Sequence, residues 1–244
     1  MLSKFISYNR SLSNKLLLFL NKHLGAIDNS EIYFYSQFNS VDITHSKILE
    51  IGGTQRPLFK KNEMLYYAGL DIDNNFDWMK IYHAYYNHSC TEKVEEKFDF
   101  IFSKYLLEHV DDNQKTFDNI IYSLHEQGKA IQIFPLGFHP YSILTRLVSN
   151  SVKKNLIKLL RPETVSVSGY PTYFNLCNSI SLKRYFSRRT DIKYSIKYFF
   201  GADDYFGFFF PLFFLSVIFN RLCKLFNLNI FASNAVLVIT KKAA

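Results

Sequence analysis

The feature that most limits the possible folds is a short apolar run that ends in two glycines. Lys47 to Ile51 (KILEI) has the character of a buried strand, and Gly52 and Gly53 follow it at once. The chain has only 9 glycines in 244 residues, so a pair at a strand end is informative. Glycines at the carboxyl end of a strand let a ligand approach the backbone closely. The pattern predicts either a ligand-binding turn of an α/β sheet or a plain strand end.

Further short apolar runs indicate a sheet. They are Leu65 to Leu70, Phe98 to Ser103, Ile131 to Phe134, Ile192 to Phe199 and Ala235 to Thr240. Helical spacing over residues 113–127 predicts a helix, with Asp111 or Asp112 as its N-cap and Gly128 as its C-terminal stop. Strands that alternate with helices or loops predict an α/β fold with a mostly parallel sheet.

The length of 244 residues suits one well-buried core with elaborations. We expect an N-terminal helical extension over residues 1–45, with an amphipathic helix at 12–24, and a main domain over 46–244. Residues 137–190 break the strand rhythm and predict a cap. Two helical patches in the cap, roughly 141–160 and 179–189, flank the irregular stretch RPETVSVSGYPTYFN.

An uncharged stretch, YFGFFFPLFFLSVIFN at 205–220, lies within a hydrophobic segment over 205–228. At about 1.5 Å per residue it would reach about 24 Å as a helix, short of the roughly 30 Å apolar core of a bilayer. Pro211 is expected to interrupt it. We favour a hydrophobic helical hairpin or interfacial segment held at a membrane surface by Arg221 and Lys224. The alternatives are a buried core helix, a dimer face or a true span.

The net charge of +8 is unevenly distributed. Residues 1–135 carry 14 Lys+Arg against 17 Asp+Glu, and residues 136–244 carry 15 against 4. A basic half favours an anionic partner such as phosphate, nucleic acid or lipid headgroups, or simply a solvated surface. The mixed basic and apolar segments 152–161 and 183–189 suit an anionic membrane surface or a phosphate-bearing lipid carrier, or an ordinary amphipathic cap.

The three cysteines are far apart and form no metal-ligand spacing. This argues for a reducing compartment and against a disulfide framework or a zinc site. We therefore expect no metal site.

An acid follows the second strand at the distance expected of a nucleoside site. Asp71 lies 21 residues after Glu50, and a strand-end carboxylate can accept hydrogen bonds from both hydroxyls of a ribose. The chain lacks G-x-G-x-x-G, which disfavours NAD and FAD.

The next strand runs into FDFIFSKYLLEHV, Phe98 to Val110. Together with LEIGG and GLDID, this segment resembles the class I S-adenosylmethionine-dependent methyltransferases of the type 11 and type 12 group. The resemblance covers about residues 46–136, and AVLVITKK is similar to the closing strand of that family. GYPTYFN, the strand at 192–199 and the apolar stretch are similar to members found with surface-polysaccharide and glycolipid genes.

The resemblance implies a Rossmann-like, doubly wound, seven-stranded methyltransferase sheet. A helical cap and a hydrophobic helical insertion before the last strand would elaborate it. It also implies S-adenosylmethionine as cofactor. By resemblance, Glu50, Gly52 and Gly53 shape the turn at the methionine side, Asp71 holds the ribose, Ile72 lies against the adenine, and the backbone of Ser103 borders the methionine amino group.

The sequence departs from the family in two places. Thr54, Gln55 and Arg56 stand where further glycines are usual, and only about ten residues separate Gly53 from the next strand. The first crossover helix is therefore expected to be short or absent. The segment 82–88 lacks the acid that usually binds the adenine amine, and Asn87 is our candidate to replace it.

Methyl transfer is an in-line displacement for which alignment matters most, and a base helps when the acceptor is a hydroxyl. His109 and His139 follow predicted strands, and an imidazole titrates near the working pH. Glu108 is a further candidate, as a partner of His109 or a contact to the methionine end. A structural role is the alternative for each.

The predicted function is methylation of a small-molecule, glycan or lipid-linked acceptor. The expected location is cytoplasmic, with peripheral association with the inner face of the membrane through 205–228. Ser103-Lys104-Tyr105-Leu106 stands where nucleic-acid amino-methylating enzymes carry [DNS]-P-P-[YFW], which disfavours a nucleic-acid substrate. The alternatives are a catalytically inactive, methyltransferase-like, membrane-associated interaction module and an RNA methyltransferase.

Overall fold

The structure is a computed structural model that describes residues 2–54, 56–148, 152, 155, 158, 170–201 and 206–243. The chain divides into two compact units. The sheet unit comprises residues 31–135, 171–197 and 235–244, and the helical unit comprises residues 1–30, 136–170 and 198–234. The segment predicted as one cap, 137–190, is divided between these units.

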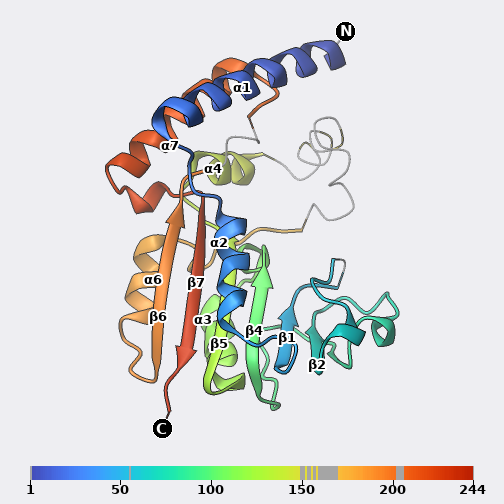
Figure 1. The fold of residues 1–244 in the computed structure, drawn as a ribbon. Coiled ribbons are helices and arrows are strands. Elements are labelled where there is room, and N and C mark those ends of the chain that lie inside the picture. Colours follow the sequence, from blue (N-terminus) through green and yellow to red (C-terminus); the bar gives the residue numbers. More distant parts are fainter. Residues whose placement is uncertain are drawn as a thin grey trace. The chain divides into compact units, whose positions relative to one another are not determined.

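The sheet has seven strands in the order β3-β2-β1-β4-β5-β7-β6 (Figure 1). Their bounds are β1 Lys47–Ile51, β2 Tyr66–Leu70, β3 Ala84–Tyr86, β4 Phe98–Lys104, β5 Leu124–Pro135, β6 Ile192–Phe199 and β7 Asn234–Lys241. Strands β1 to β5 pair in parallel. Strand β7 is antiparallel to β6. The Lys242 amide donates to the Asp191 carbonyl at one end of the pair, and the Ser233 amide donates to the Phe199 carbonyl at the other. The expected α/β, Rossmann-like, seven-stranded methyltransferase sheet is confirmed.

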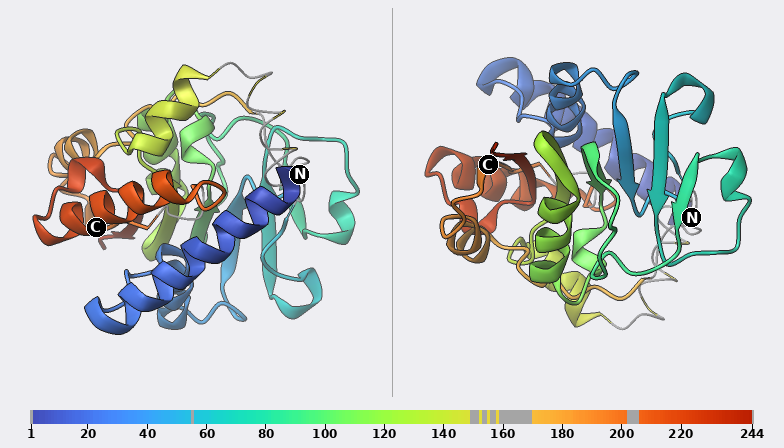
Figure 2. Two further views of the ribbon diagram at one scale, coloured as in Figure 1. Left: turned by 90° about the horizontal axis from the view of Figure 1, so that it is seen from above. Right: turned by 90° about the horizontal axis from the view of Figure 1, so that it is seen from below.

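Helices of the sheet unit lie on both faces of the sheet (Figures 1 and 2). Helix α2 (Ser30–Ser36) lies on one face, and α3 (Asn113–Ser123) and α6 (Ser179–Phe186) lie on the other. A 3₁₀ turn, η1 (Gln37–Ser40), extends α2. Asp112 caps α3 by accepting the Lys115 amide at 3.1 Å, as one of the two predicted caps.

The predicted end of α3 at Gly128 is wrong. The helix ends at Ser123, and Gly128 lies inside β5, where the pairing with β4 shifts register between Phe98 and Phe100. A Cβ at Gly128 would lie 2.8 Å from the His125 carbonyl oxygen. Glycine therefore serves an irregular stretch of strand rather than a helix stop.

The connection from β1 to β2 contains no α-helix in its described part, only the 3₁₀ turn η2 (Lys61–Glu63), as expected. An aromatic cluster fills the neighbouring core. The Phe38 ring lies 5.5 Å from the Phe102 ring, and the Phe59 ring lies 5.6 Å from Phe102 and 5.7 Å from Tyr67. Rings from loops and from η1 therefore cover strands that a crossover helix would otherwise bury.

The helical unit contains α1 (Leu2–Leu24), α4 (Pro140–Leu147), α7 (Phe210–Leu225) and the 3₁₀ turn η7 (Asn229–Phe231). Helices α1 and α7 lie side by side (Figure 2). Phe206, Phe213 and Val217 form a buried hydrophobic cluster in this unit, and Leu16, Leu17, Leu20, Tyr141 and Leu212 pack against it.

Residues 210–225 form one helix, α7, so the predicted hairpin is wrong, whereas the predicted interfacial placement stays a prediction. Pro211 lies in the first turn of α7, where its missing N–H has no intrahelical partner to lose, and it begins the helix instead of interrupting it. None of the described helices combines the length and the hydropathy that a membrane span requires.

Of the two basic segments predicted to meet an anionic surface, the structure describes mainly the second. Residues 152–161 lie mostly outside the described residues, and α4 covers only the start of the helical patch predicted at 141–160. In the other segment, the Arg189 guanidinium contacts Asp118 and lies 2.8 Å from Asp191. Part of that positive charge is therefore neutralised within the sheet unit.

Candidate functional site

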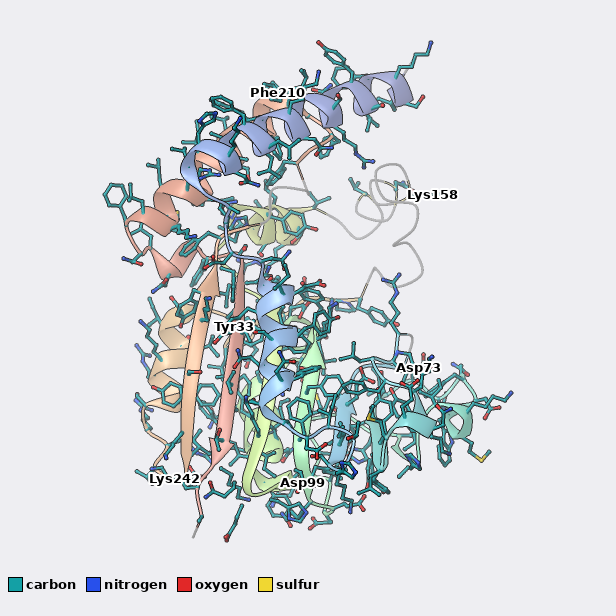
Figure 3. The ribbon with its side chains drawn as sticks, viewed as in Figure 1. Tyr33, Asp73, Asp99, Lys158, Phe210 and Lys242 are labelled. Carbon is teal, nitrogen blue, oxygen red and sulfur yellow. The ribbon has the colours of Figure 1, made fainter. Side chains whose placement is uncertain are left out.

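The parallel register brings the carboxyl ends of β1, β2 and β4 to one edge of the sheet. Ile51 pairs with Leu70 on one side and with Ser103 on the other. The residues that follow these positions therefore leave the sheet together. Asp73 lies beyond this edge, and Asp99 marks the opposite edge (Figure 3).

The turn after β1 requires both of its glycines. Gly52 has φ +78, a conformation that side chains disfavour, and its amide donates to the Leu70 carbonyl at 2.9 Å. A Cβ at Gly52 would lie 2.8 Å from the Leu106 side chain, and a Cβ at Gly53 would lie 2.0 Å from the Glu50 carboxyl carbon. The pair of glycines is therefore a fixed element of the site.

Glu50 is buried, with 4% of its surface exposed. Its Oε2 accepts hydrogen bonds from the hydroxyls of Tyr67 and Tyr82, the latter at 3.1 Å. Burial raises the pKa of Glu50 to about 7, although both hydrogen bonds act to lower it. A Cβ at Gly69 would lie 2.6 Å from the Tyr82 ring, so this glycine makes room for the ring. Glu50 is thus anchored by the chain itself, beside the glycine turn.

The two tyrosines were missed by sequence reasoning. An acid in the middle of an apolar strand needs donors, and that requirement was the available signal. The sequence does not say which of its 17 tyrosines supply them.

Asp71 follows β2 with its carboxylate held in a fixed orientation. The Thr54 hydroxyl donates to Oδ2 at 2.8 Å, and the Asp73 amide donates to Oδ1 at 3.2 Å. The backbone carbonyl of Asp71 accepts from the Tyr85 hydroxyl and from the Asn87 side-chain nitrogen, each at 3.1 Å. Thr54, one of the departures from the family pattern, therefore positions the acid.

Two residues expected near an adenine flank this loop. Ile72 is 70% exposed. Asn87 is exposed, and its side-chain nitrogen is engaged with Asp71, so its side-chain oxygen is the atom suited to accept a hydrogen bond from a ligand. Their predicted contacts to adenine stay predictions.

Ser103 is buried at the end of β4, and its hydroxyl donates to the Gln132 side-chain oxygen on β5. The side chain is therefore committed to the neighbouring strand. A role toward a ligand would fall to the backbone, as predicted, and stays a prediction.

Glu108 lies in the 3₁₀ turn η4 (Leu107–His109) that follows β4. The residue is 6% exposed, and its Oε2 has no hydrogen-bond partner in the described part of the chain. Burial raises its pKa to about 8. Its backbone carbonyl accepts from the amides of Tyr173 and Phe174, at 2.8 and 3.2 Å. The raised pKa favours the protonated carboxyl near pH 7, and that form can donate a hydrogen bond.

His109 is adjacent, with its Nε2 3.8 Å from Glu108 Oε1. Its Nδ1 lies 2.7 Å from the Pro171 carbonyl oxygen. A carbonyl can only accept, so Nδ1 carries the proton in the neutral ring and Nε2 does not. Burial lowers the pKa of His109, which favours this neutral form near pH 7.

Residues 171–178 of the sheet unit dock onto this turn. The Asn113 side-chain nitrogen donates to Leu107 at 2.7 Å and to Asn175 at 2.6 Å. Phe174 and Leu176 adopt positive φ angles of 51 and 54. Residues 171–175 of the GYPTYFN stretch, which was expected in the cap, therefore support η4 within the sheet unit.

His139 has the structural role that the sequence left open as the alternative to catalysis. It is 1% exposed and caps α4, because its Nδ1 accepts the Tyr141 amide at 3.2 Å. Its Nε2 therefore carries the proton and donates to Asn220 Oδ1 at 3.0 Å. His139 belongs to the helical unit, whereas Glu108 and His109 lie together in the sheet unit.

Across the described residues, no group of three or more His, Cys, Asp or Glu side chains could hold a metal ion. Cys90, Cys177 and Cys223 are free thiols.

No protein-family model and no curated protein matches the sequence. Solved structures similar to the chain include phosphoethanolamine N-methyltransferase 2 of Haemonchus contortus in complex with S-adenosyl-L-methionine. It is 16% identical, with a TM-score of 0.49, over 90% of this chain and 53% of that one. The YcgJ protein of Bacillus subtilis is 12% identical, with a TM-score of 0.48, over 88% and 99%. An S-adenosylmethionine-dependent methyltransferase of Mesorhizobium loti is 10% identical, with a TM-score of 0.49, over 85% and 97%.

The chain thus spans about half the length of the Haemonchus enzyme and nearly all of the other two. The strand order and the reversed β7 define the architecture. The chain has the class I methyltransferase fold.

Proposed function

We propose that the protein is an S-adenosylmethionine-dependent methyltransferase whose cofactor site is the edge formed by the carboxyl ends of β1, β2 and β4. The observation that carries the proposal is the glycine turn beside an oriented strand-end acid. Gly52 and Gly53 leave no room for side chains, and Asp71 presents a fixed carboxylate next to them. Ligands of open α/β sheets bind at this edge.

The residues present fit this cofactor. A carboxylate has about four acceptor positions, so Asp71 can accept both ribose hydroxyls besides the two donors it already has. Glu50, Gly52 and Gly53 would form the turn at the methionine side, and the Ser103 backbone would border the amino group. Ile72 and Asn87 would face the adenine. When bound, the cofactor would supply a methyl group already activated on a sulfonium sulfur.

The chain's own contribution to the chemistry would come from η4. His109 is neutral near pH 7 and has an unprotonated Nε2, which suits it to take a proton from an acceptor hydroxyl or ammonium group. Glu108 is protonated at that pH, so it can donate a hydrogen bond to an acceptor oxygen. His139 is not included, because both of its ring nitrogens are engaged.

We propose a small-molecule, glycan or lipid-linked acceptor, methylated in the cytoplasm or at the inner face of the membrane. The sequence Ser103-Lys104-Tyr105-Leu106 after β4 supports this over a nucleic-acid amine. A catalytically inactive interaction module is the alternative that a failed cofactor test would favour.

The test is isothermal titration of the full chain with S-adenosylmethionine and with S-adenosylhomocysteine, for the native sequence and for Asp71→Ala. We expect micromolar binding that weakens roughly thirtyfold in Asp71→Ala, since two hydrogen bonds to a charged group are lost. Asp77→Ala is the matched control. Asp77 lies in the same loop, is half exposed and forms an ion pair with Lys80, so its removal should leave affinity unchanged.

Two results would overturn the proposal. Native protein that binds neither ligand would remove the methyltransferase function altogether. Asp71→Ala that binds as tightly as the native chain would keep a cofactor but place it elsewhere.

A further inference from the structure

Helix α7 exposes a row of large apolar side chains. Phe214, Leu215, Ile218, Leu222 and Leu225 are 42, 63, 40, 48 and 70% exposed. They recur at spacings of one, three and four residues, so they form one stripe along the helix. We call these five residues the α7 stripe.

The opposite face of α7 is the buried one, and it is less apolar. Phe213, Val217, Asn220 and Cys223 are buried there, and the Asn220 side-chain oxygen accepts the His139 hydrogen bond. A helix on the surface of a protein in water normally presents polar residues outward. Helix α7 is instead apolar on its outward face as well as on its buried face, and this points to a partner that covers the stripe.

The apolar surface continues past the end of the helix. Phe226, Leu228 and Phe231 are 65, 42 and 37% exposed. An apolar surface of this extent on one element is typical of an interaction site rather than of scattered exposed residues.

The neighbouring helix α1 carries cations and no acid. Lys4, Lys15 and Lys22 lie 11 and 7 residues apart, which places them along one line of the helix, and all three are exposed. Tyr8, Leu18 and Phe19 are also exposed on α1, at 65, 71 and 59%. Exposed lysines interleaved with aromatic and leucine side chains are typical of helices that lie in a membrane interface.

The charge of the helical unit is one-sided. Residues 1–30, 136–170 and 198–234 contain 11 of the 29 Lys+Arg but only 4 of the 21 Asp+Glu. Neither α1 nor α7 contains an acid. Asp28 is the one acid among the described residues of this unit, and Lys224 lies 3.8 Å from it.

We infer that the helical unit binds the surface of an anionic membrane, with the α7 stripe at the level of the lipid headgroups and the lysines of α1 near lipid phosphates. Charge favours this partner over a second copy of the chain. Two copies that met through their α7 stripes would bring two strongly basic units together, whereas an anionic surface neutralises them. The inference does not depend on cofactor binding.

The experiment is sedimentation of the full chain with phosphatidylcholine vesicles, with and without phosphatidylserine. The first variant is Leu215→Gln/Leu222→Gln/Leu225→Gln, which removes the α7 stripe. Its matched control is Ile32→Gln/Leu65→Gln/Met79→Gln in the sheet unit, where the three side chains are 71, 66 and 63% exposed. We expect the first variant to bind all vesicles at least roughly tenfold more weakly and the control to bind as the native chain does.

The second variant is Lys4→Gln/Lys15→Gln/Lys22→Gln, with Lys60→Gln/Lys80→Gln/Lys115→Gln in the sheet unit as its control. We expect the native chain to bind at least roughly tenfold more tightly when phosphatidylserine is present, and the second variant to lose that preference. Circular dichroism and thermal unfolding establish that each variant is folded.

The inference is overturned if the native chain does not sediment with phosphatidylserine vesicles, or if the α7 variant binds them as well as its control. Sedimentation equilibrium measures the oligomeric state and so tests whether a second copy of the chain covers the stripe instead. A native dimer that the α7 variant converts to a monomer, without vesicle binding by either, would assign the stripe to a second copy. None of these results bears on cofactor titration. The membrane inference and the proposed function can therefore be overturned independently of each other.

Discussion

Two glutamates are buried near the carboxyl ends of adjacent parallel strands, and the protein treats them differently. Glu50 in β1 receives hydrogen bonds from two tyrosine hydroxyls, and burial raises its pKa to about 7. Glu108, just after β4, has an oxygen with no partner among the described residues, and burial raises its pKa to about 8. Glu50 and Glu108 are thus buried to a similar extent, but only the Glu50 carboxyl has its oxygen Oε2 hydrogen-bonded within the described residues.

The difference separates a structural acid from one suited to function. A buried carboxyl whose hydrogen bonds are satisfied stabilises its surroundings, and one that is left unsatisfied costs free energy that a ligand could recover. Glu50 therefore belongs to the framework of the glycine turn. Glu108, beside His109, is the better candidate for contact with a reacting group.

The substitution with the largest expected effect is Gly53→Ala, which tests whether Glu50 is held in place by its tyrosine partners. A methyl group there would lie 2.0 Å from the Glu50 carboxyl carbon, so the carboxyl must move and lose its tyrosine partners. We expect the free energy of unfolding to fall by about 4 kcal/mol, measured by urea denaturation. Gly201→Ala is the control, because its nearest neighbour atom would be 3.7 Å away. Equal effects of the two substitutions would show that Glu50 is not held as described.

The Glu108 side can be tested through pH. In the folded chain its pKa is about 8, above the ordinary value of 4.5, so the folded state holds the proton more tightly than the unfolded state. This stabilisation is complete below pH 4.5 and is lost as pH rises through 8. Unfolding free energy should therefore fall by about 3 kcal/mol between pH 5 and pH 8 from this group.

Glu108→Gln should flatten that pH dependence through pH 8, whereas Glu50→Gln should flatten it only up to about pH 7. Urea denaturation of the three proteins at several pH values measures both slopes. If the native chain and Glu108→Gln lost stability in parallel between pH 7 and pH 8, the carboxyl would already be ionised.

The framework of this site could be predicted from the sequence because it depends on local pattern. The run KILEI followed by two glycines, and an acid 21 residues after Glu50, predicted the edge of the sheet where Gly52 and Asp71 lie. His139 could have been recognised as well. It precedes Pro140 at the start of a helical pattern, and that position favours an N-cap.

The partners of the buried acids could not be predicted, since they depend on contacts between segments distant in sequence. Tyr82 reaches Glu50 from a loop 32 residues away, through space left by Gly69. Gly128 was misread for the same reason, because the shift of register between β4 and β5 has no signal within either strand alone. Local patterns fix where strands end, and tertiary packing decides which side chains meet there.

The finest test of the comparison is Tyr82→Phe, which makes Glu50 more like Glu108. The substitution keeps the ring and removes one of the two hydroxyls that bond Glu50 Oε2. We expect a loss of about 1 kcal/mol in unfolding free energy. We also expect a rise in the pKa of Glu50, since that hydrogen bond lowers it. The measurement is the carboxyl chemical shift of ¹³C-labelled glutamate as pH is varied. Tyr122→Phe, which removes a hydroxyl bonded to the surface acid Glu95, is the control and should leave the titration of Glu50 unchanged. If the pKa of Glu50 is the same in Tyr82→Phe as in the native chain, the Tyr67 hydroxyl alone satisfies this carboxyl. A single hydroxyl would then distinguish Glu50, the structural acid, from Glu108, whose carboxyl is left available.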